Sequence, residues 1–186
     1  MNGGHTMSTQ YYDEVNYKFI MYLDMDGVTA SENYIVKIHD YFIKDDKEWK
    51  YRNFMQQYCL QKEAVETLNA IYDVAPFTII LSTTRRFEFT PTEWNLIYRI
   101  NGVKAYIGGR TGKSDNHWRE TEIEEYHFKD AGMFSFKDKP FIIIDDDCFD
   151  LQKYKDKLVH VSTKTGLTMY YYNEILDKLR KQGVDV

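Results

Sequence analysis

The chain has 186 residues, of which 24 are basic and 29 are acidic, giving a net charge of −5. This length predicts one domain with its own core, and the charge excludes a global attraction to polyanions, so a nucleic-acid partner would need a local basic patch. With only two cysteines and no run near the ~20 apolar residues of a membrane span, we expect a cytoplasmic protein with reduced thiols.

Short apolar runs alternate with helical patterns after a polar start. Residues 1–12 are expected to be a flexible leader, and residues 13–186 a single domain. The apolar runs predict five strands, at 18–23, 77–82, 103–108, 141–145 and 158–162. Helical spacing of apolar residues predicts helices around 64–72, 91–100, 119–129 and 168–181. This alternation predicts an α/β, three-layer Rossmann-like fold with a mostly parallel five-stranded central sheet.

Two segments carry more specific predictions. Thr90, Pro91 and Glu93 form the pattern of a capping box at the start of a helix. Residues 29–60 interrupt the alternation with a long polar and aromatic stretch. That stretch predicts surface helices, a small cap over the site just before it, or both.

Polar side chains end three of the predicted strands. Ligands of an open parallel sheet bind at the carboxyl ends of the strands. We therefore expect these side chains to meet at one edge: Asp24, Asp26, Ser82, Thr83, Asp145, Asp146 and Asp147. So much negative charge in one crevice is costly unless a divalent cation offsets it, and carboxylate oxygens suit Mg²⁺.

Phosphoryl transfer would use this arrangement well. One carboxylate can attack phosphorus and form an aspartyl phosphate while the metal screens charge repulsion. A second carboxylic acid can protonate the leaving alcohol and later deprotonate the hydrolytic water. Asp24 and Asp26 could divide these two roles, because the following Gly27 allows the chain to turn there.

The motifs "LDMDGV", "IILSTTRR" and "FIIIDDD" resemble, in order, the first, second and fourth motifs of the haloacid dehalogenase-like phosphohydrolases. The resemblance covers roughly residues 17–180. More narrowly, "RETEI" and the "GLT" at 166–168 make the chain similar to the small phosphatase-like domains found beside RNA-repair enzymes. The resemblance implies a HAD-like fold and Mg²⁺ as cofactor.

The resemblance also implies roles for the acids. Asp24 matches the nucleophile and a metal ligand. Asp26 matches the general acid and base, with its backbone carbonyl on the metal. Asp145 matches an acid that meets the metal, and Asp146 one that acts through water or the site network. The implied metal set is therefore Asp24, Asp26, Asp145 and Asp146.

Ser82 matches the hydroxyl that binds the phosphate. The third motif is a lone basic residue, for which Arg119 is the first choice and Lys113 the second. Basic side chains could also form a local rim around the substrate: Arg85, Arg86, Lys104, Arg110, Lys113 and Arg119. The expected catalytic set is Asp24, Asp26, Ser82 and Arg119, and the expected substrate-binding set is Thr83, Arg85, Arg86 and Lys113.

The sequence thus predicts a Mg²⁺-dependent phosphatase. Its substrate is a phosphorylated small molecule such as a nucleotide, or a nucleic-acid end. The alternative is a weakly catalytic or non-catalytic phosphate-binding module on the same fold. A receiver domain is disfavoured because the Asp-x-Asp comes first and the acid cluster last. "GGRTGK" lacks the spacing of a nucleotide-binding P-loop.

Overall fold

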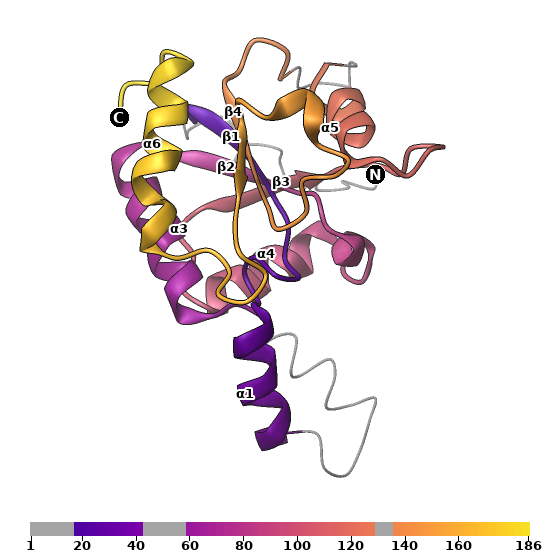
Figure 1. Cartoon of the computed structure of the whole chain (residues 1–186), viewed down its shortest axis with the longest axis vertical. Coiled ribbons are helices and arrows are strands. Elements are labelled where there is room, and N and C mark those ends of the chain that lie inside the picture. Colours follow the sequence, from indigo (N-terminus) through magenta and orange to yellow (C-terminus); the bar gives the residue numbers. More distant parts are fainter. Residues whose placement is uncertain (1–16, 43–58, 129–135) are drawn as a thin grey trace, which may run out of the picture.

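A five-stranded parallel sheet forms the centre of the protein, and the computed structural model describes residues 17–42, 59–128 and 136–186. The strand order is β3-β2-β1-β4-β5. The strands are β1 (Phe19–Leu23), β2 (Phe77–Leu81), β3 (Tyr106–Arg110), β4 (Phe141–Asp145) and β5 (Leu158–His160). The longer helices are α1 (Glu32–Phe42), α3 (Lys62–Val74), α4 (Pro91–Ile100), α5 (Arg119–Phe128) and α6 (Tyr172–Lys181) (Figure 1).

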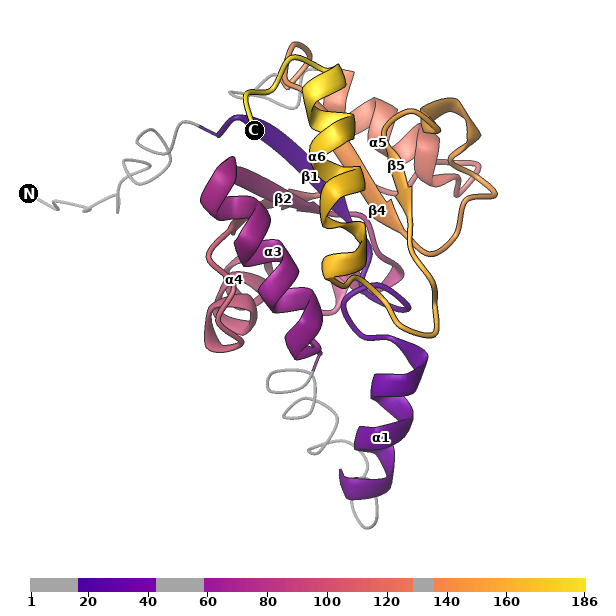
Figure 2. The same ribbon diagram turned by 60° about the vertical axis from the view of Figure 1, so that its left-hand side comes forward.

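Both faces of the sheet are covered, as the continuously apolar strands predict. Alternate residues of β1 enter different clusters: Phe19 and Met21 pack with α3, α4 and α6, whereas Ile20 and Tyr22 pack with Ile123 of α5. Figure 2 shows α3 and α6 side by side across one face, with α5 behind the sheet. This confirms the predicted three-layer α/β architecture.

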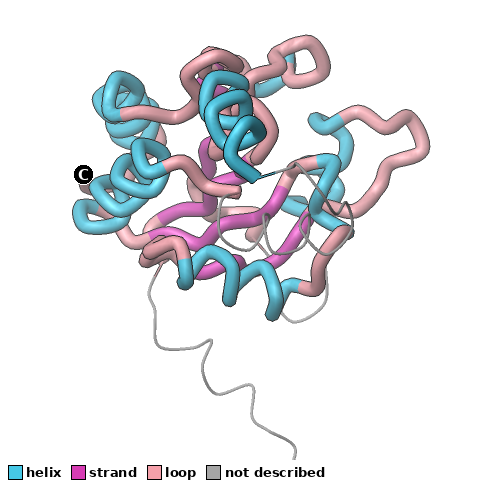
Figure 3. The backbone as a smooth tube through the Cα atoms, turned by 90° about the horizontal axis from the view of Figure 1, so that it is seen from below, coloured by secondary structure: helices cyan, strands magenta, loops and turns pink. Residues whose placement is uncertain are grey.

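The order in which the strands are added to the sheet changes direction between β1 and β4. From β1 it moves to β2 and β3 on one side, and β4 and β5 follow on the other. Seen along the long axis, the strands form one layer among the helices (Figure 3). Such a switch point is where ligands bind in open α/β sheets, and the pair Leu23 and Ile144 ends the β1–β4 register there.

The third strand begins later than predicted. Val103 and Ala105 are buried in the core without joining the sheet, and the strand instead continues beyond Gly108 through Gly109 to Arg110. A Cβ at Gly109 would overlap the hydroxyl of Tyr126, so a glycine is needed for this close approach. The apolar run therefore fills the core ahead of the strand, and the "GGR" of the rejected P-loop forms part of the sheet.

The helix predictions are confirmed with one shift at the end of the chain. Thr90 and Glu93 form the predicted capping box of α4. Met169–Tyr171 forms a short 3-10 helix, η4, so that α6 starts at Tyr172 rather than near 168. The buried stripe Ile175, Leu176 and Leu179 of α6 lies where the periodicity places it.

The predicted cap and leader are described only in part. Within 29–60, α1 extends away from the carboxyl edge of the sheet (Figure 1), and Val36 on it is 63 % exposed. Residues 43–58 of this segment, and all of the predicted leader 1–12, lie outside the described residues. Among the described helices, none has the length and apolar character needed to cross a membrane.

Candidate active site

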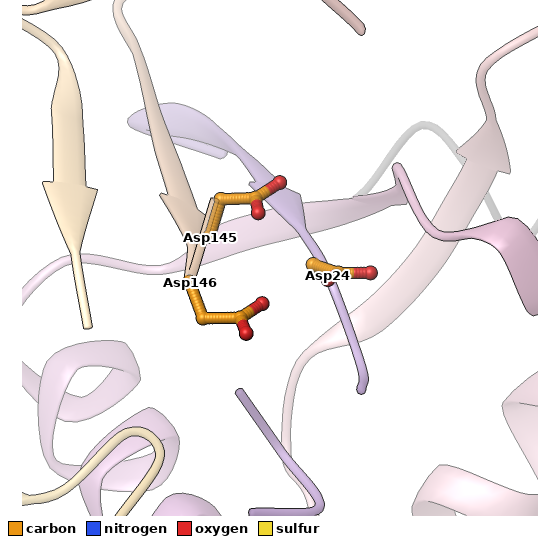
Figure 4. Close-up of side chains that lie close together, drawn as sticks. All are labelled: Asp24, Asp145 and Asp146. Atoms are coloured by element: carbon orange, nitrogen blue, oxygen red, sulfur yellow. The ribbon is translucent and has the colours of Figure 1, made fainter. Parts of the chain in front are cut away.

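Three aspartates meet at the switch point between β1 and β4. Asp24, Asp145 and Asp146 each offer a carboxylate oxygen, and these oxygens lie within 4.8 Å of one another. Figure 4 shows the three carboxyl groups gathered around one space. The pairing of β1 with β4 continues past Leu23, since Asp24 N donates to Ile144 O at 3.1 Å. The sheet register itself therefore holds Asp24 opposite Asp145.

Burial makes this group of acids electrostatically expensive. Asp24 is 3 % exposed and Asp145 is 1 % exposed. Burial raises the pKa of Asp24 to about 6 although the charge of Arg119 opposes it. Burial also raises the pKa of Asp145 to about 8, with the charge of Asp24 adding to the effect and Arg119 opposing it. A bound cation would reverse these shifts because it favours the charged forms.

The donor set fits Mg²⁺. Three carboxylates supply the hard oxygen ligands that this ion prefers. Oδ1 of Asp24 is buried and lies 3.2 Å from Nη1 of Arg119, without the geometry of a hydrogen bond. A buried carboxylate oxygen whose capacity to accept is not fully used is well suited to bind a metal ion.

Arg119, the first residue of α5, lies against the acids. Its Nη1 is 2.6 Å from Asp145 Oδ2 and 3.2 Å from Asp24 Oδ1. Although burial lowers the pKa of Arg119, the charges of Asp24 and Asp145 raise it above its ordinary value. The carboxylate of Asp150 holds the start of the helix by accepting from Arg119 N at 2.9 Å. The first choice for the basic residue of the third motif thus lies beside two of the four expected metal ligands.

Ser82 and Thr83 follow β2 at the same edge. Ser82 N continues the sheet by donating to Leu23 O at 3.0 Å, and Ser82 O accepts from Arg119 Nη1 at 2.6 Å. The buried Oγ of Ser82 has no hydrogen-bond partner among the described residues. A free buried hydroxyl at this position suits a phosphoryl oxygen. Thr83 is fully buried, and its side chain accepts from Arg85 N at 3.3 Å.

Asp26 lies apart from the three-carboxylate group. Its side chain is 51 % exposed, and Oδ2 lies 2.9 Å from Nε of Arg85. Gly27, with a φ of +75°, turns the chain immediately after it. Two of the expected site residues, Asp26 and Arg85, therefore form an exposed ion pair beside the buried acids.

Arg86 does not project toward a substrate, in contrast to its expected role. Its guanidinium is buried and donates to the carbonyls of Thr83, Thr111 and Gly112 at 2.6, 3.0 and 2.6 Å, and to Glu122 Oε2 at 2.8 Å. Because its donors are used in these hydrogen bonds, Arg86 connects the loops that follow β2 and β3 to α5. We therefore leave it out of the substrate site.

The remaining basic residues of the expected rim divide between the two edges. Lys113 is exposed, and its Nζ lies 5.3 Å from the ring centroid of Phe87. Lys104 precedes β3 and binds Asp73 at 2.6 Å, so it belongs to the opposite edge of the sheet. The predicted rim is thus wrong for Lys104.

Sequence reasoning missed the residues that position Asp146. Thr163 Oγ1 donates to Asp146 Oδ2 at 2.9 Å, and His160 Nε2 lies 2.9 Å from the carbonyl oxygen of Asp146. A Cβ at Gly27 would overlap the carboxyl group of Asp146. The "DG" of the first motif was the available signal for Gly27, whereas no local pattern marks Thr163.

One of the comparisons with known proteins identifies a family. The model of a family described as the HAD domain in Swiss Army Knife RNA repair proteins matches residues 20–171. That range contains all the expected site residues. No curated protein and no solved structure matches the chain.

Proposed function

Since the chain belongs to the family of HAD domains in Swiss Army Knife RNA repair proteins, we propose that it is a Mg²⁺-dependent phosphomonoesterase that works through a phosphorylated Asp24. The observation that carries this proposal is the group of three carboxylates at the switch point, held within 4.8 Å of one another. The cost of burying these charges is hard to explain without a cation or a reaction. We place the reaction in the cytoplasm, in keeping with the free thiols of Cys59 and Cys148.

The three carboxylates would hold the metal, together with the backbone carbonyl of Asp26 that the family resemblance suggests. When bound, Mg²⁺ supplies charge neutralisation at the phosphoryl oxygens. The protein supplies the remaining positive charge through Arg119, which already contacts Asp24 and Asp145. Ser82 Oγ, buried and without a described partner, is the donor for a phosphoryl oxygen.

In the first step a carboxylate oxygen of Asp24 attacks phosphorus and the bond to the leaving oxygen breaks. The proton that the leaving oxygen needs comes from Asp26, which is exposed toward solvent and oriented by Arg85. In the second step water attacks the aspartyl phosphate, one proton of that water passes to Asp26, and the bond between phosphorus and Asp24 breaks. Protons balance over the two steps because Asp26 gives one proton to the leaving group and takes one from the water.

The proposed substrate is a nucleotide or a phosphorylated nucleic-acid end. The association of the family with RNA repair supports this class. Among small molecules, other phosphomonoesters would fit the same chemistry, so the leaving group must be recognised outside the acid cluster.

A phosphate-binding module with little turnover is the second candidate. The ion pair of Arg119 with Asp24 favours it, because the positive charge of Arg119 stabilises the carboxylate of Asp24 and so makes it a weaker nucleophile. Turnover distinguishes the two functions.

The test is hydrolysis of an aryl phosphate in Mg²⁺ and in EDTA. We expect Mg²⁺-dependent release of phosphate, and a fall of at least ~10³-fold in kcat for Asp24→Asn, because removing a nucleophile removes the covalent route. Asp177→Asn is the matched control, since Asp177 is 64 % exposed in an ion pair on α6. Retained turnover in Asp24→Asn would refute the mechanism, and absence of turnover in the wild type would favour the binding module.

A further inference from the structure

An exposed aromatic ring among cations lies beside the proposed active site. Phe87 ends the 3-10 helix η2 (Thr84–Phe87) and is 43 % exposed. The guanidinium carbons of Arg110 and Arg86 lie 4.7 and 4.9 Å from its ring centroid, and Lys113 Nζ lies at 5.3 Å. Arg110 ends β3 and Lys113 follows it, so two neighbouring strands deliver this cluster to the carboxyl edge of the sheet.

Two of these cations have no carboxylate partner among the described residues. Arg86 is paired with Glu122. In contrast, neither Arg110 nor Lys113 forms an ion pair with any carboxylate in the part of the chain that the structure describes. Nη1 of Arg110 donates to the carbonyls of Arg86 and Phe89 at 2.9 and 3.0 Å, which fixes its guanidinium near the ring. Within the described residues, a chain of net charge −5 thus presents a positive patch without a carboxylate partner around an exposed aromatic ring.

The cluster lies a short distance from the phosphoryl site. Thr83 caps η2 and directly follows Ser82, whose buried Oγ is the proposed donor to the phosphoryl oxygen. Phe87 comes four residues later, and a 3-10 helix rises ~2 Å per residue, which gives about 8 Å along its axis. The sugar and base of a nucleotide can bridge this distance between the phosphoryl site and Phe87. The single ring of a small aryl phosphate does not extend far beyond it.

We propose that Phe87, Arg110 and Lys113 form a subsite for the nucleotide next to the terminal phosphate, so that the substrate is the phosphorylated end of a single-stranded oligonucleotide. The base stacks on Phe87, and the internucleotide phosphate binds Arg110 and Lys113. This inference rests on the proposed phosphatase function and names its substrate class. A mononucleotide has no second phosphate for this patch, so it is the poorer substrate.

The test compares kcat/KM for a trinucleotide that carries a terminal phosphate with kcat/KM for the matching mononucleotide, in Mg²⁺, with 5′- and 3′-phosphate series run in parallel. The wild type should prefer the trinucleotide in at least one series. Phe87→Leu should reduce this preference by about 5- to 150-fold, the range expected for losing one stacked base. Lys113→Gln should lower the slope of log kcat/KM against log salt by about 0.7 for the trinucleotide.

Phe128→Leu is the matched control for Phe87→Leu. Phe128 is also 43 % exposed but packs edge-to-face against Phe141, the first residue of β4, at the opposite edge of the sheet. Its replacement should leave the ratio of the two kcat/KM values unchanged. Equal rates for the trinucleotide and the mononucleotide in the wild type, or an unchanged ratio in Phe87→Leu, would overturn the subsite.

A binding measurement separates failure of the subsite from failure of the phosphatase proposal. Fluorescence anisotropy of a labelled, phosphate-ended trinucleotide gives Kd in the Asp24→Asn background, where no turnover is needed. Adding Phe87→Leu should raise that Kd about 5- to 150-fold, and adding Phe128→Leu should not. If the wild type turns over no phosphate ester, this shift still decides the subsite, while the phosphatase proposal falls by itself.

Discussion

Replacement of Gly27 by alanine should weaken the metal site through a direct overlap. Gly27 adopts a φ of +75°, and an added Cβ would overlap the carboxyl group of Asp146. To relieve the overlap, Asp146 must move, and its hydrogen bond from Thr163 at 2.9 Å must break or lengthen. Losing a partner that orients a metal ligand typically costs 10- to 100-fold in metal affinity. We expect that rise in the Kd for Mg²⁺.

The backbone strain of the same substitution needs its own control. A left-handed residue other than glycine costs ~1–2 kcal/mol, which corresponds to a fall in Tm of about 2–8 °C for a chain of this size. Gly102 has a φ of +85°, but the nearest atom to its added Cβ is 3.9 Å away, in Val65. Gly102→Ala should therefore lower Tm by about that amount and leave the Kd for Mg²⁺ unchanged.

Titration calorimetry gives the Kd for Mg²⁺ of both variants. Thermal unfolding in EDTA gives the fall in Tm that backbone strain causes in the absence of the metal. The reasoning fails if Gly27→Ala binds Mg²⁺ like the wild type. It also fails if Gly102→Ala weakens Mg²⁺ binding as much as Gly27→Ala, because strain alone would then explain the loss.

Two further predictions concern charge. Burial raises the pKa of Asp24 to about 6 and that of Asp145 to about 8. The stability that these groups give the metal-free fold is therefore full below their ordinary pKa of 3.8 and is lost as pH rises through both raised values, whereas Mg²⁺ needs both carboxylates ionised. At one fixed Mg²⁺ concentration, set to 100 times the Kd at pH 8.5, the difference in Tm from the protein in EDTA should be small at pH 5 and about 5–11 °C at pH 8.5, from ~2.7 kcal/mol of binding; equal shifts at both pH values would contradict the assignment. Arg86→Met should lower the free energy of unfolding, measured in urea, by ~3–5 kcal/mol, because Glu122 then stays buried and unpaired. Arg180→Met, which breaks a half-exposed ion pair, should lower it by ~1 kcal/mol or less. Similar losses in the two variants would show that the Arg86 network is not structural.

The sheet and the acid cluster could be predicted because one local signal specifies both. A continuously apolar run such as Ile142-Ile143-Ile144 reads as a strand buried on both faces, and the acids that end it must lie at the carboxyl edge. Two such runs that are neighbours in a parallel sheet, as β1 and β4 are, bring their carboxyl ends together. Asp24, Asp145 and Asp146 therefore meet as the sequence predicts.

The different ion-pair partners of the two consecutive arginines could not be predicted from the sequence. Arg85 and Arg86 have the same chemistry and the same local sequence, yet one pairs with exposed Asp26 and the other with buried Glu122. The difference arises from the turn of η2 and from a partner 36 residues away. Similarly, the hydrogen bond of Thr163 to Asp146 joins residues 17 apart across β5. Such pairings depend on tertiary structure, which composition and periodicity do not encode.

The alternation of β1 explains why Arg119, and not Lys113, meets the acids. Ile20 and Tyr22 face the layer of α5, so Asp24, two residues further, faces it too, and Arg119 is the first residue of that helix. Lys113 instead follows β3, which is separated from β1 by β2.

The resulting contact complements a cation rather than replacing it. Fully ionised, Asp24, Asp145 and Asp146 carry −3, and Arg119 adds +1, which leaves −2. One Mg²⁺ brings that sum to zero. The ion pair of Arg119 with Asp24 therefore does not by itself favour a site without a metal, because an arginine alone leaves two negative charges in a buried space. A measured stoichiometry of one Mg²⁺ per chain would agree with this charge balance. Arg119→Met should tighten Mg²⁺ binding if only the net charge of the site mattered. It should weaken Mg²⁺ binding if Arg119 also fixes the carboxylates in place.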